Sequence, residues 1–268
     1  MRTFFRAWPN STLSIGAAPL AASCFLLCLF SSVPGLAAAD PKSSGRLTQI
    51  VREVNVLDTE AAARRAVLNE LLGEGSAVRT GGDSRAELTF LDQTIARLGA
   101  NSLYSFRRAG RELELKAGST LLRVPKNSGG ATILAPGITA GITGTTVIFE
   151  QTRSRESRLT VLEGTARLSL AAHPDQRRDL RAGQTLQVPA GATRLPEPTE
   201  IDLDQLVKTS PLIVGFRPLP SLNLINQAIR QQRDRGALNR NNPNAPRPPQ
   251  QNAPGPPAPG PPPAPGPR

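Results

Sequence analysis

The sequence predicts an all-β fold, an irregular β-solenoid or sandwich-like unit, followed by one or two short helices and a disordered proline-rich tail. Short apolar runs recur between residues 46 and 195 and are separated by glycine-rich turns. Several runs alternate polar and apolar residues, as a strand with one buried face does. Aromatic residues make up only 4% of the chain, so we expect a core of Leu, Val, Ile and Ala.

The N-terminal segment is typical of an export signal. Arg2 and Arg6 precede an uncharged, mostly apolar run over Leu20–Phe30. That run has the length of the apolar region of a signal peptide and is too short for a comfortable membrane span. We therefore expect residues 1–39 to form a signal peptide.

A small-residue cleavage site follows the apolar run. Ala37–Ala39 supplies an A-x-A pattern, which predicts a mature chain that begins at Asp40. The alternative is an uncleaved anchor over Leu13–Ala39. Cys24 and Cys28 both lie before the site, so the mature chain would hold no disulfide and no reactive thiol. A lipoprotein acylated at Cys24 is a weaker alternative, because the residues before it fit the lipoprotein pattern poorly.

The region over residues 46–195 is the predicted β domain. Strong turn signals stand at Gly81–Ser84 and at Lys126–Gly130. A continuous β-branched run predicts one strand that is buried on both faces. The strand candidates are Ala86–Leu91, Arg111–Lys116, Thr145–Phe149 (the buried one), Leu159–Leu162 and Ala166–Leu170.

A similar short glycine motif recurs along these strands. Each glycine follows an apolar residue after one or two positions and precedes a new apolar run; the four are Gly75, Gly118, Gly164 and Gly183. Glycine can adopt a positive φ, so each position suits a corner before the next strand. Because the spacings between these glycines are unequal, the recurrence indicates similar turns rather than a strict sequence repeat.

Three segments have helical composition. Thr59–Leu72 predicts a helix, with a strand-and-loop insertion as the alternative. Glu200–Val207 and Ser221–Gln232 predict two short helices in an extension over residues 196–236, and Ser221 is a suitable N-cap. We expect these two helices to pack on the end of the β domain or on a partner.

Residues 237–268 are rich in proline and lack apolar periodicity. Proline fixes φ and removes a backbone donor, so such a segment favours polyproline II and stays disordered. We interpret it as a semi-rigid spacer, with a docking ligand or a wall-spanning extension as the alternative.

The stretch Leu72–Val188 resembles the FecR domain, because several motifs of that family occur in the family's order. The opening turn and strand pair is matched by GEGSAVRTGGDSRAELTFLDQTIARLGANS and a later strand by RELELKAGSTLLRV. The central signature is matched by ILAPGITAGITGTTVIFE, and the closing segments by LTVLEGTARLSL and LRAGQTLQVPAG. The resemblance implies an extracytoplasmic all-β module.

The match has departures from the family pattern. Ala135 stands where threonine is usual, Thr143 where arginine is usual and Val147 where an aromatic residue is usual, and Asp92-Gln93 replaces Asp-Gly. None of them alters the β pattern, but they weaken any inference of a shared binding surface. We expect a structural role rather than ligand contact for the family-motif positions, which are Gly75, Arg79, Thr80, Gly81, Pro136, Gly144, Thr145, Gly164 and Gly183.

The sequence predicts no enzyme, and we assign no catalytic, cofactor-binding or metal-binding residue. The single histidine, His173, precedes Pro174 in a polar loop, whereas a metal site or a Ser/His/Asp relay needs several oriented groups. Glu112 and Glu114 share one strand face, where we expect them to meet solvent and arginine. A glycosidase whose two carboxylates come from distant segments remains a weaker alternative.

The net charge of +11 permits attraction to anionic polymers. We expect no nucleic-acid partner, because the chain carries an export signal and its basic residues are not interleaved with aromatics. The leading interpretation is a periplasmic, secreted or cell-envelope binding or scaffold protein that contacts an envelope protein, a glycan or an anionic envelope polymer.

The main alternative function is a periplasmic signalling component of a FecR-type regulatory system for iron uptake or a sigma factor. FecR-type regulators carry a cytoplasmic sigma-factor-binding domain and one membrane span. About a dozen residues precede the apolar segment Leu13–Ala39 here, so we do not expect direct anti-sigma activity.

Overall fold

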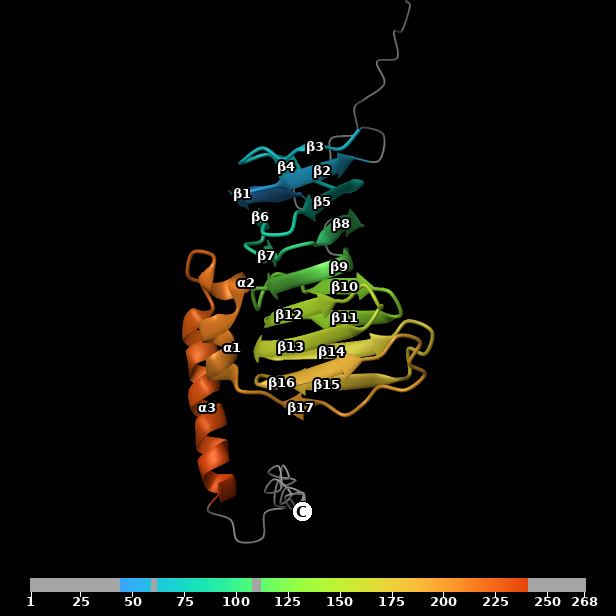
Figure 1. Cartoon of the computed structure of the whole chain (residues 1–268). Helices are drawn as coiled ribbons and strands as arrows, with labels where there is room; N and C mark the ends of the chain where they lie inside the picture. Colours follow the sequence, from blue (N-terminus) through green and yellow to red (C-terminus); the bar gives the residue numbers. More distant parts are fainter. Residues whose placement is uncertain (1–43, 59–61, 108–111, 241–268) are drawn as a thin grey trace, which may run out of the picture. The chain divides into compact units, whose positions relative to one another are not determined.

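The computed structural model describes residues 44–58, 62–107 and 112–240, and for residues 237–240 the backbone alone. This part of the chain forms strands followed by three helices (Figure 1). The strands are β1 (Gly45–Val51), β2 (Val54–Asp58), β3 (Arg64–Arg65), β4 (Leu71–Leu72), β5 (Ser76–Thr80), β6 (Arg85–Phe90), β7 (Ile95–Leu98), β8 (Leu103–Arg107), β9 (Glu112–Arg123), β10 (Ala131–Ala135), β11 (Ile138–Ile142), β12 (Thr146–Gln151), β13 (Ser157–Glu163), β14 (Thr165–Leu170), β15 (Arg177–Arg181), β16 (Gln184–Val188) and β17 (Thr199–Glu200). The helices are α1 (Leu203–Thr209), α2 (Pro211–Val214) and α3 (Leu222–Arg240).

The strands pair into two sheets that share one strand. Sheet A has the order β4-β1-β6-β7-β9-β12-β13-β16-β17. Sheet B has the order β3-β2-β5-β8-β9-β10-β11-β14-β15. The twelve-residue β9 pairs through its first half in sheet B and through its second half in sheet A. The predicted irregular, sandwich-like all-β fold is confirmed.

The main core lies between the two sheets. Strand alternation puts Val147 and Phe149 of β12 into this core, while Ile148 between them faces the other side of sheet A. Tyr104 and Phe106 of β8 enter the core from sheet B, with their ring centroids 5.5 Å apart in an edge-on arrangement. Phe90 and Phe149 are the other aromatic members, and the rest of this core is aliphatic, as the low aromatic content predicted.

The chain passes between the sheets at tight corners, and Gly118 marks the bend of β9. Its φ is +91°, and a Cβ there would collide with Ser102. Glycine is therefore the residue that lets β9 turn from sheet B into sheet A.

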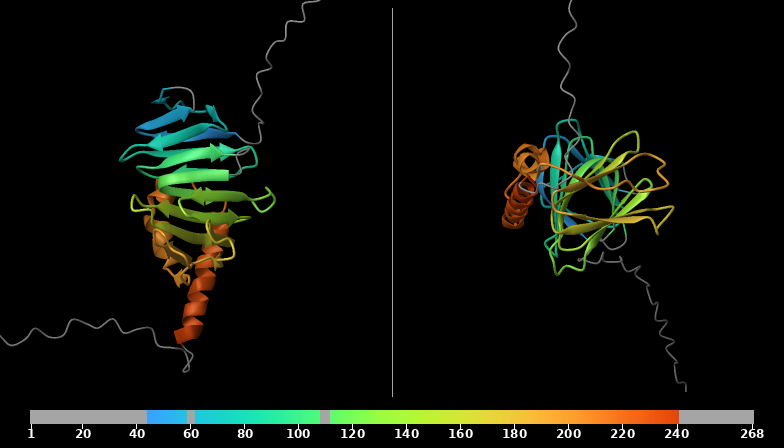
Figure 2. Two further views of the ribbon diagram at one scale, coloured as in Figure 1. Left: turned by 90° about the vertical axis from the view of Figure 1, so that its right-hand side faces the viewer. Right: turned by 90° about the horizontal axis from the view of Figure 1, so that it is seen from below.

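The three helices cover the outer face of sheet A and leave the outer face of sheet B free. Leu121, Ile148 and Leu162 project outward from sheet A into a second apolar cluster. The helical side supplies the rest of that cluster, namely Leu203, Leu212, Leu219, Ile225, Ala228 and Ile229. Seen from below, the helices stand on one side of the paired sheets (Figure 2, right).

The helix predicted over Thr59–Leu72 is wrong in its described part, which forms β3 and β4 joined by a turn. The N–H of Ala66 donates to the Val54 carbonyl of β2, and the N–H of Asn69 donates to the Leu47 carbonyl of β1. Pairing with the open edges of both sheets thus overrides the helical propensity of this segment. The alternative, a strand-and-loop insertion, fits what is found.

The two C-terminal helices predicted from sequence are present with shifted bounds. The first begins at Leu203 rather than Glu200, and the second continues to Arg240, past the expected boundary at residue 236. They pack along sheet A rather than at an end of the β unit. The short α2 was not predicted.

The signal-peptide and lipidation predictions fall on residues 1–39, and most of the predicted proline-rich tail falls on residues 241–268; both segments lie outside the described residues. Within the described ranges, no helix combines the length and the apolar character that crossing a bilayer requires.

Candidate functional site

The first cluster of family-motif residues is a hydrogen-bonded corner between the sheets. Thr80 lies at the end of β5, and its Oγ1 donates to the Gly99 carbonyl at 2.6 Å and accepts from the Ser102 N–H at 2.9 Å. Ser102 Oγ in turn donates to the Ser119 carbonyl at 3.0 Å. Because Thr80 and Ser102 are both buried, these hydroxyls satisfy backbone groups that cannot reach water.

A second corner repeats this construction at the start of β12. Thr145 is fully buried, and its Oγ1 donates to the Thr165 carbonyl at 2.7 Å. Gly164 has a φ of +78°, and a Cβ there would lie 2.8 Å from the Gly144 carbonyl oxygen and 2.9 Å from Thr145 Oγ1. Three motif positions therefore meet here in backbone packing that leaves no space for a side chain at residue 164.

The other motif positions lie at separate points of the β unit. Arg79 is exposed on the outer face of sheet B, and Pro136 lies in the turn between β10 and β11. Gly75 precedes β5, Gly81 follows it, and Gly183 stands between β15 and β16. The structure does not bring the motif residues together into one reactive site.

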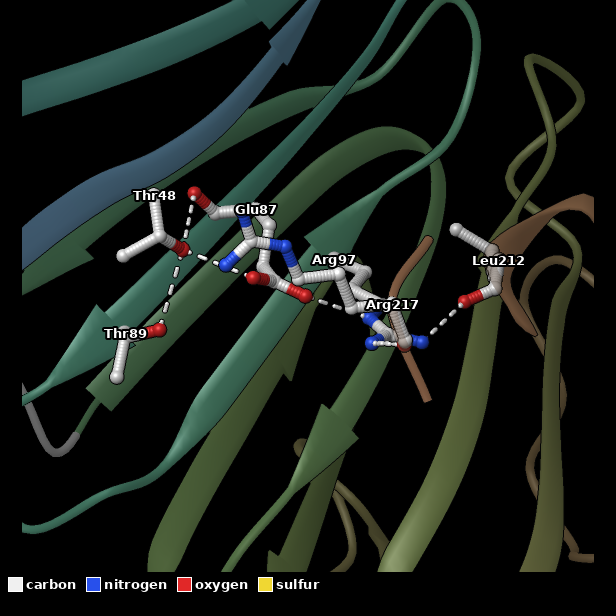
Figure 3. A network of polar contacts seen from close by, with 6 residues as sticks. All are labelled: Thr48, Glu87, Thr89, Arg97, Leu212 and Arg217. Carbon is white, nitrogen blue, oxygen red and sulfur yellow. Dashed lines mark hydrogen bonds and ion pairs between the residues drawn. The ribbon is translucent and has the colours of Figure 1, made fainter. Parts of the chain in front are cut away.

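The most elaborate buried polar cluster, which the sequence reasoning missed, joins sheet A to the helices (Figure 3). Arg97 of β7 is 1% exposed; its Nε donates to Glu87 Oε2 at 2.9 Å and its Nη1 donates to the Leu212 carbonyl at 3.1 Å. Its Nη2 donates to the Arg217 carbonyl, and its Cζ lies 4.8 Å from the centroid of the Phe216 ring.

Glu87 is itself held by a neighbouring strand. Thr48 Oγ1 of β1 donates to Glu87 Oε1 at 2.9 Å, so both carboxylate oxygens have partners. Burial lowers the pKa of the Arg97 guanidinium, and the hydrogen bond and charge of Glu87 oppose that shift. The Arg97–Glu87 pair therefore fixes α2 and the segment that follows it, and we call this pair the ionic clamp. All three guanidinium nitrogens of Arg97 and both carboxylate oxygens of Glu87 are hydrogen-bonded.

A fourth polar group links β12 and β13 to the start of α3. Thr146 Oγ1 lies 2.9 Å from Glu163 Oε1 and 2.9 Å from Ser221 Oγ. Burial raises the pKa of the Glu163 carboxyl, and the hydrogen bond from Thr146 and the charges of Lys126 and Arg123 oppose the rise. The Ser221 hydroxyl is thus directed at the sheet.

The outer face of sheet B is the broad uncovered surface of the β unit. None of its outward side chains is buried, whereas Glu87, Arg97, Thr146 and Ile148 on the outer face of sheet A are all buried. On sheet B, Arg167 donates to both carboxylate oxygens of Asp179, at 2.7 and 3.1 Å. This face offers polar and charged side chains on a rigid strand framework.

The other predicted candidates lie away from these clusters. His173 is exposed in the turn between β14 and β15. Glu114 pairs with Arg107 at 3.0 Å, as expected for a solvent-facing strand position. In the part of the chain that the structure describes, no three potential metal-ligating side chains gather into a cluster.

Residues 76–167 match the family model described as "FecR protein", which covers less than half of the chain. Two crystal structures of a proposed anti-sigma factor from Parabacteroides distasonis ATCC 8503 are similar, with 12% sequence identity and a TM-score of 0.42. Each alignment covers 49% of this chain and 62% of that chain, so it spans less than two thirds of the neighbour. The search of curated proteins gives no match.

The family match agrees with the architecture. It begins at Ser76, the first residue of β5, and ends at Arg167 within β14, so it includes both hydroxyl-lined corners and the bent strand β9. The described unit continues beyond the match, through β1–β4 on one side and through β15–α3 on the other. Residues 76–167 of this chain are a FecR domain.

Proposed function

We propose that the protein is an exported, non-enzymatic component of a FecR-type regulatory system, and that it works by binding a partner protein outside the cytoplasm. The single observation that carries the proposal is the FecR domain at residues 76–167. The export signal predicted in residues 1–39 supports the location, and the contribution of the chain to regulation would then depend on contacts made in the envelope.

The uncovered outer face of sheet B supports a binding role. The FecR domain contributes β5, β8 and β9–β11, together with the start of β14, to this face. Its side chains stand on paired strands, and a rigid surface loses little entropy when it docks. The helices leave this face open because they pack on the opposite sheet.

The buried charged groups support a non-enzymatic role. Arg97 is committed to Glu87 and to the backbone carbonyls of Leu212 and Arg217. Glu163 is committed to Thr146 beneath α3. A general acid or base needs access to a substrate, whereas these groups hold secondary structure together.

The test of this function combines location with transcription. Cells that lack the gene are compared by RNA sequencing with cells that carry the full chain or a chain without residues 1–39. We expect a defined set of transcripts to change on deletion and to be restored by the full chain alone, which should fractionate with the envelope. Unchanged transcripts, or rescue by the leaderless chain, would contradict the proposal.

A second candidate function is a scaffold that binds an anionic envelope polymer. It is favoured by the basic end of sheet B, where three arginines project outward, namely Arg167, Arg177 and Arg181. Asp179 pairs with Arg167 and Glu200 pairs with Arg181, so Arg177 is the one of the three without an ion pair among the described residues. Binding of this kind weakens strongly with salt. Co-sedimentation with an anionic polysaccharide that is lost in Arg177→Ser and at high salt would favour it over the regulatory role.

A further inference from the structure

A groove of about 730 Å³ lies between the outer face of sheet A and the helices α1 and α2. One wall is formed by the turn before β6 and by β12 and β13, and the other by the end of α1 and the start of α2. The groove lies beside the ionic clamp, because Leu212, whose carbonyl accepts from Arg97, also lines it. Neither the FecR match nor the proposed regulatory role assigns a ligand to it.

Arg85 is the unusual residue of this groove. It is only half-buried, but its Nε is buried and has no hydrogen-bond partner. The guanidinium lies against Gly215 at the end of α2, where a Cβ would come within 3.1 Å of both Cζ and Nε. Among the described residues, no carboxylate forms an ion pair with it. Its Nε is shielded from the groove, so a ligand would accept from the other guanidinium nitrogens of Arg85, which form no hydrogen bond with the described residues.

The other charged groups of the groove already have partners. Arg52 pairs with Asp83 at 2.8 Å, and Glu150 pairs with Arg158 at 3.4 Å. The guanidinium of Arg85 is therefore the uncompensated charge of the lining. This charge balance favours a ligand with one negative group.

Two hydroxyls and an apolar wall complete the site. Ser119 and Ser210 both line the groove, and within the described ranges neither hydroxyl takes part in a hydrogen bond. Ile148, Leu206 and Leu212 provide the apolar lining. A single cation with free hydroxyls beside an apolar wall is the usual composition of a small-molecule pocket, and the volume lies within the usual range of about 300–1,000 Å³.

We propose that this groove binds a small amphipathic monocarboxylate, whose carboxylate accepts from Arg85 and whose apolar part lies against Leu206 and Leu212. Planar guanidinium groups bind carboxylates through paired hydrogen bonds. The hydroxyls of Ser119 and Ser210 supply further donors. The site would let the helices respond to a soluble envelope metabolite, because α1 and α2 form one wall.

The test uses the purified full chain and 4-phenylbutyrate as the probe. Isothermal titration should give a Kd below about 1 mM. The neutral 4-phenylbutanamide and the cationic 4-phenylbutylamine should bind at least about tenfold more weakly, because only the acid accepts from a charged donor. Acetate should bind more weakly as well, because it cannot cover the apolar wall.

Variants locate the site. Arg85→Met should weaken binding of 4-phenylbutyrate by at least about tenfold, whereas Arg177→Met removes the same charge on sheet B and should leave the Kd within about twofold. Gly82→Leu provides a second test if Arg85→Met fails to fold. A Cβ at Gly82 meets no atom within 4 Å, so a larger side chain can stand at the mouth of the groove and obstruct it.

Three results would overturn the proposal. The first is no binding of 4-phenylbutyrate by the folded wild-type chain. The second is equal binding by wild type, Arg85→Met and Gly82→Leu. The third is binding of an acidic peptide at this groove in preference to the small acid, which would make it a protein-docking site instead. The outcome is independent of the transcription test, because a ligand can bind whether or not the chain regulates transcription.

Discussion

Arg97 Nε lies 2.9 Å from Glu87 Oε2 beneath the segment that joins α2 to α3, and the Arg97 side chain is 1% exposed. The same guanidinium donates to the backbone carbonyls of Leu212 and Arg217. One side chain of the FecR domain therefore holds a segment that lies outside the family match. The helices are an integral part of the unit and not a loose extension.

Replacing Arg97 by methionine should strongly destabilise the chain. The substitution leaves the Glu87 carboxylate buried without its cation, and such a loss lowers the free energy of unfolding by about 3–5 kcal/mol. Urea unfolding followed by circular dichroism measures it. Arg158→Met is the matched control, because its ion pair with Glu150 is exposed and should contribute less than about 1 kcal/mol. Equal losses of unfolding free energy in the two variants would contradict a stabilising role of the Arg97–Glu87 pair beyond that of an exposed ion pair.

Helix α3 should stabilise the folded chain through its buried face. Ile225 is fully buried in the cluster against sheet A, so Ile225→Ala should lower the free energy of unfolding by about 2–5 kcal/mol. Leu224 is 40% exposed, and Leu224→Ala should have a clearly smaller effect. Thermal unfolding of both variants provides the comparison, and a larger loss at Leu224 would mean that α3 packs differently.

The second corner makes a sharp prediction about two glycines with similar backbone angles. Gly164 and Gly137 have φ values of +78° and +86°, so alanine at either position incurs a backbone penalty of about 1–2 kcal/mol. At Gly164 a Cβ would also press on the Gly144 carbonyl, whereas at Gly137 it meets nothing within 4 Å. Gly164→Ala should therefore be the more destabilising substitution in chemical unfolding. Equal denaturant midpoints for Gly164→Ala and Gly137→Ala would show that the backbone around residue 164 shifts to accommodate the added Cβ.

The buried Glu163 predicts a specific pH dependence. Burial raises the pKa of the folded-state carboxyl above its usual value near 4.5, so folding favours the protonated form. The corresponding stability is fully present below the unfolded pKa and is lost as the pH rises through the folded pKa. The unfolding free energy of Glu163→Gln relative to that of wild type should therefore increase as the pH rises from about 4 to 7. Unfolding free energies of both proteins across that range test this, and parallel curves would exclude a titrating Glu163.

Much of the β unit could be predicted from local patterns. Alternation at Ala86–Leu91 identified β6, and the continuous β-branched run at Thr145–Phe149 identified a strand that is buried on both faces. That second observation already implied a covering layer, since Ile148 faces away from the main core. Glycine spacing pointed to corners because a positive φ is a local property of the backbone.

The functional clusters could not be predicted in the same way. Arg97 sits at a polar position of an alternating strand, where an arginine usually meets solvent, and its burial depends on carbonyls more than a hundred residues later in the chain. The segment Thr59–Leu72 has helical composition, but the free edges of β1 and β2 determine its conformation. Long-range hydrogen bonding decided both cases.

The most direct test of the central claim is site-specific photo-crosslinking in intact cells. A photoreactive residue is placed at Arg79 or Arg167 on the outer face of sheet B, or at the exposed Arg230 of α3 as the control. We expect the two sheet B positions to capture the same envelope regulatory protein and Arg230 to capture none. Capture from Arg230 alone, or no envelope partner from either sheet B position, would contradict a FecR domain that binds through its uncovered sheet.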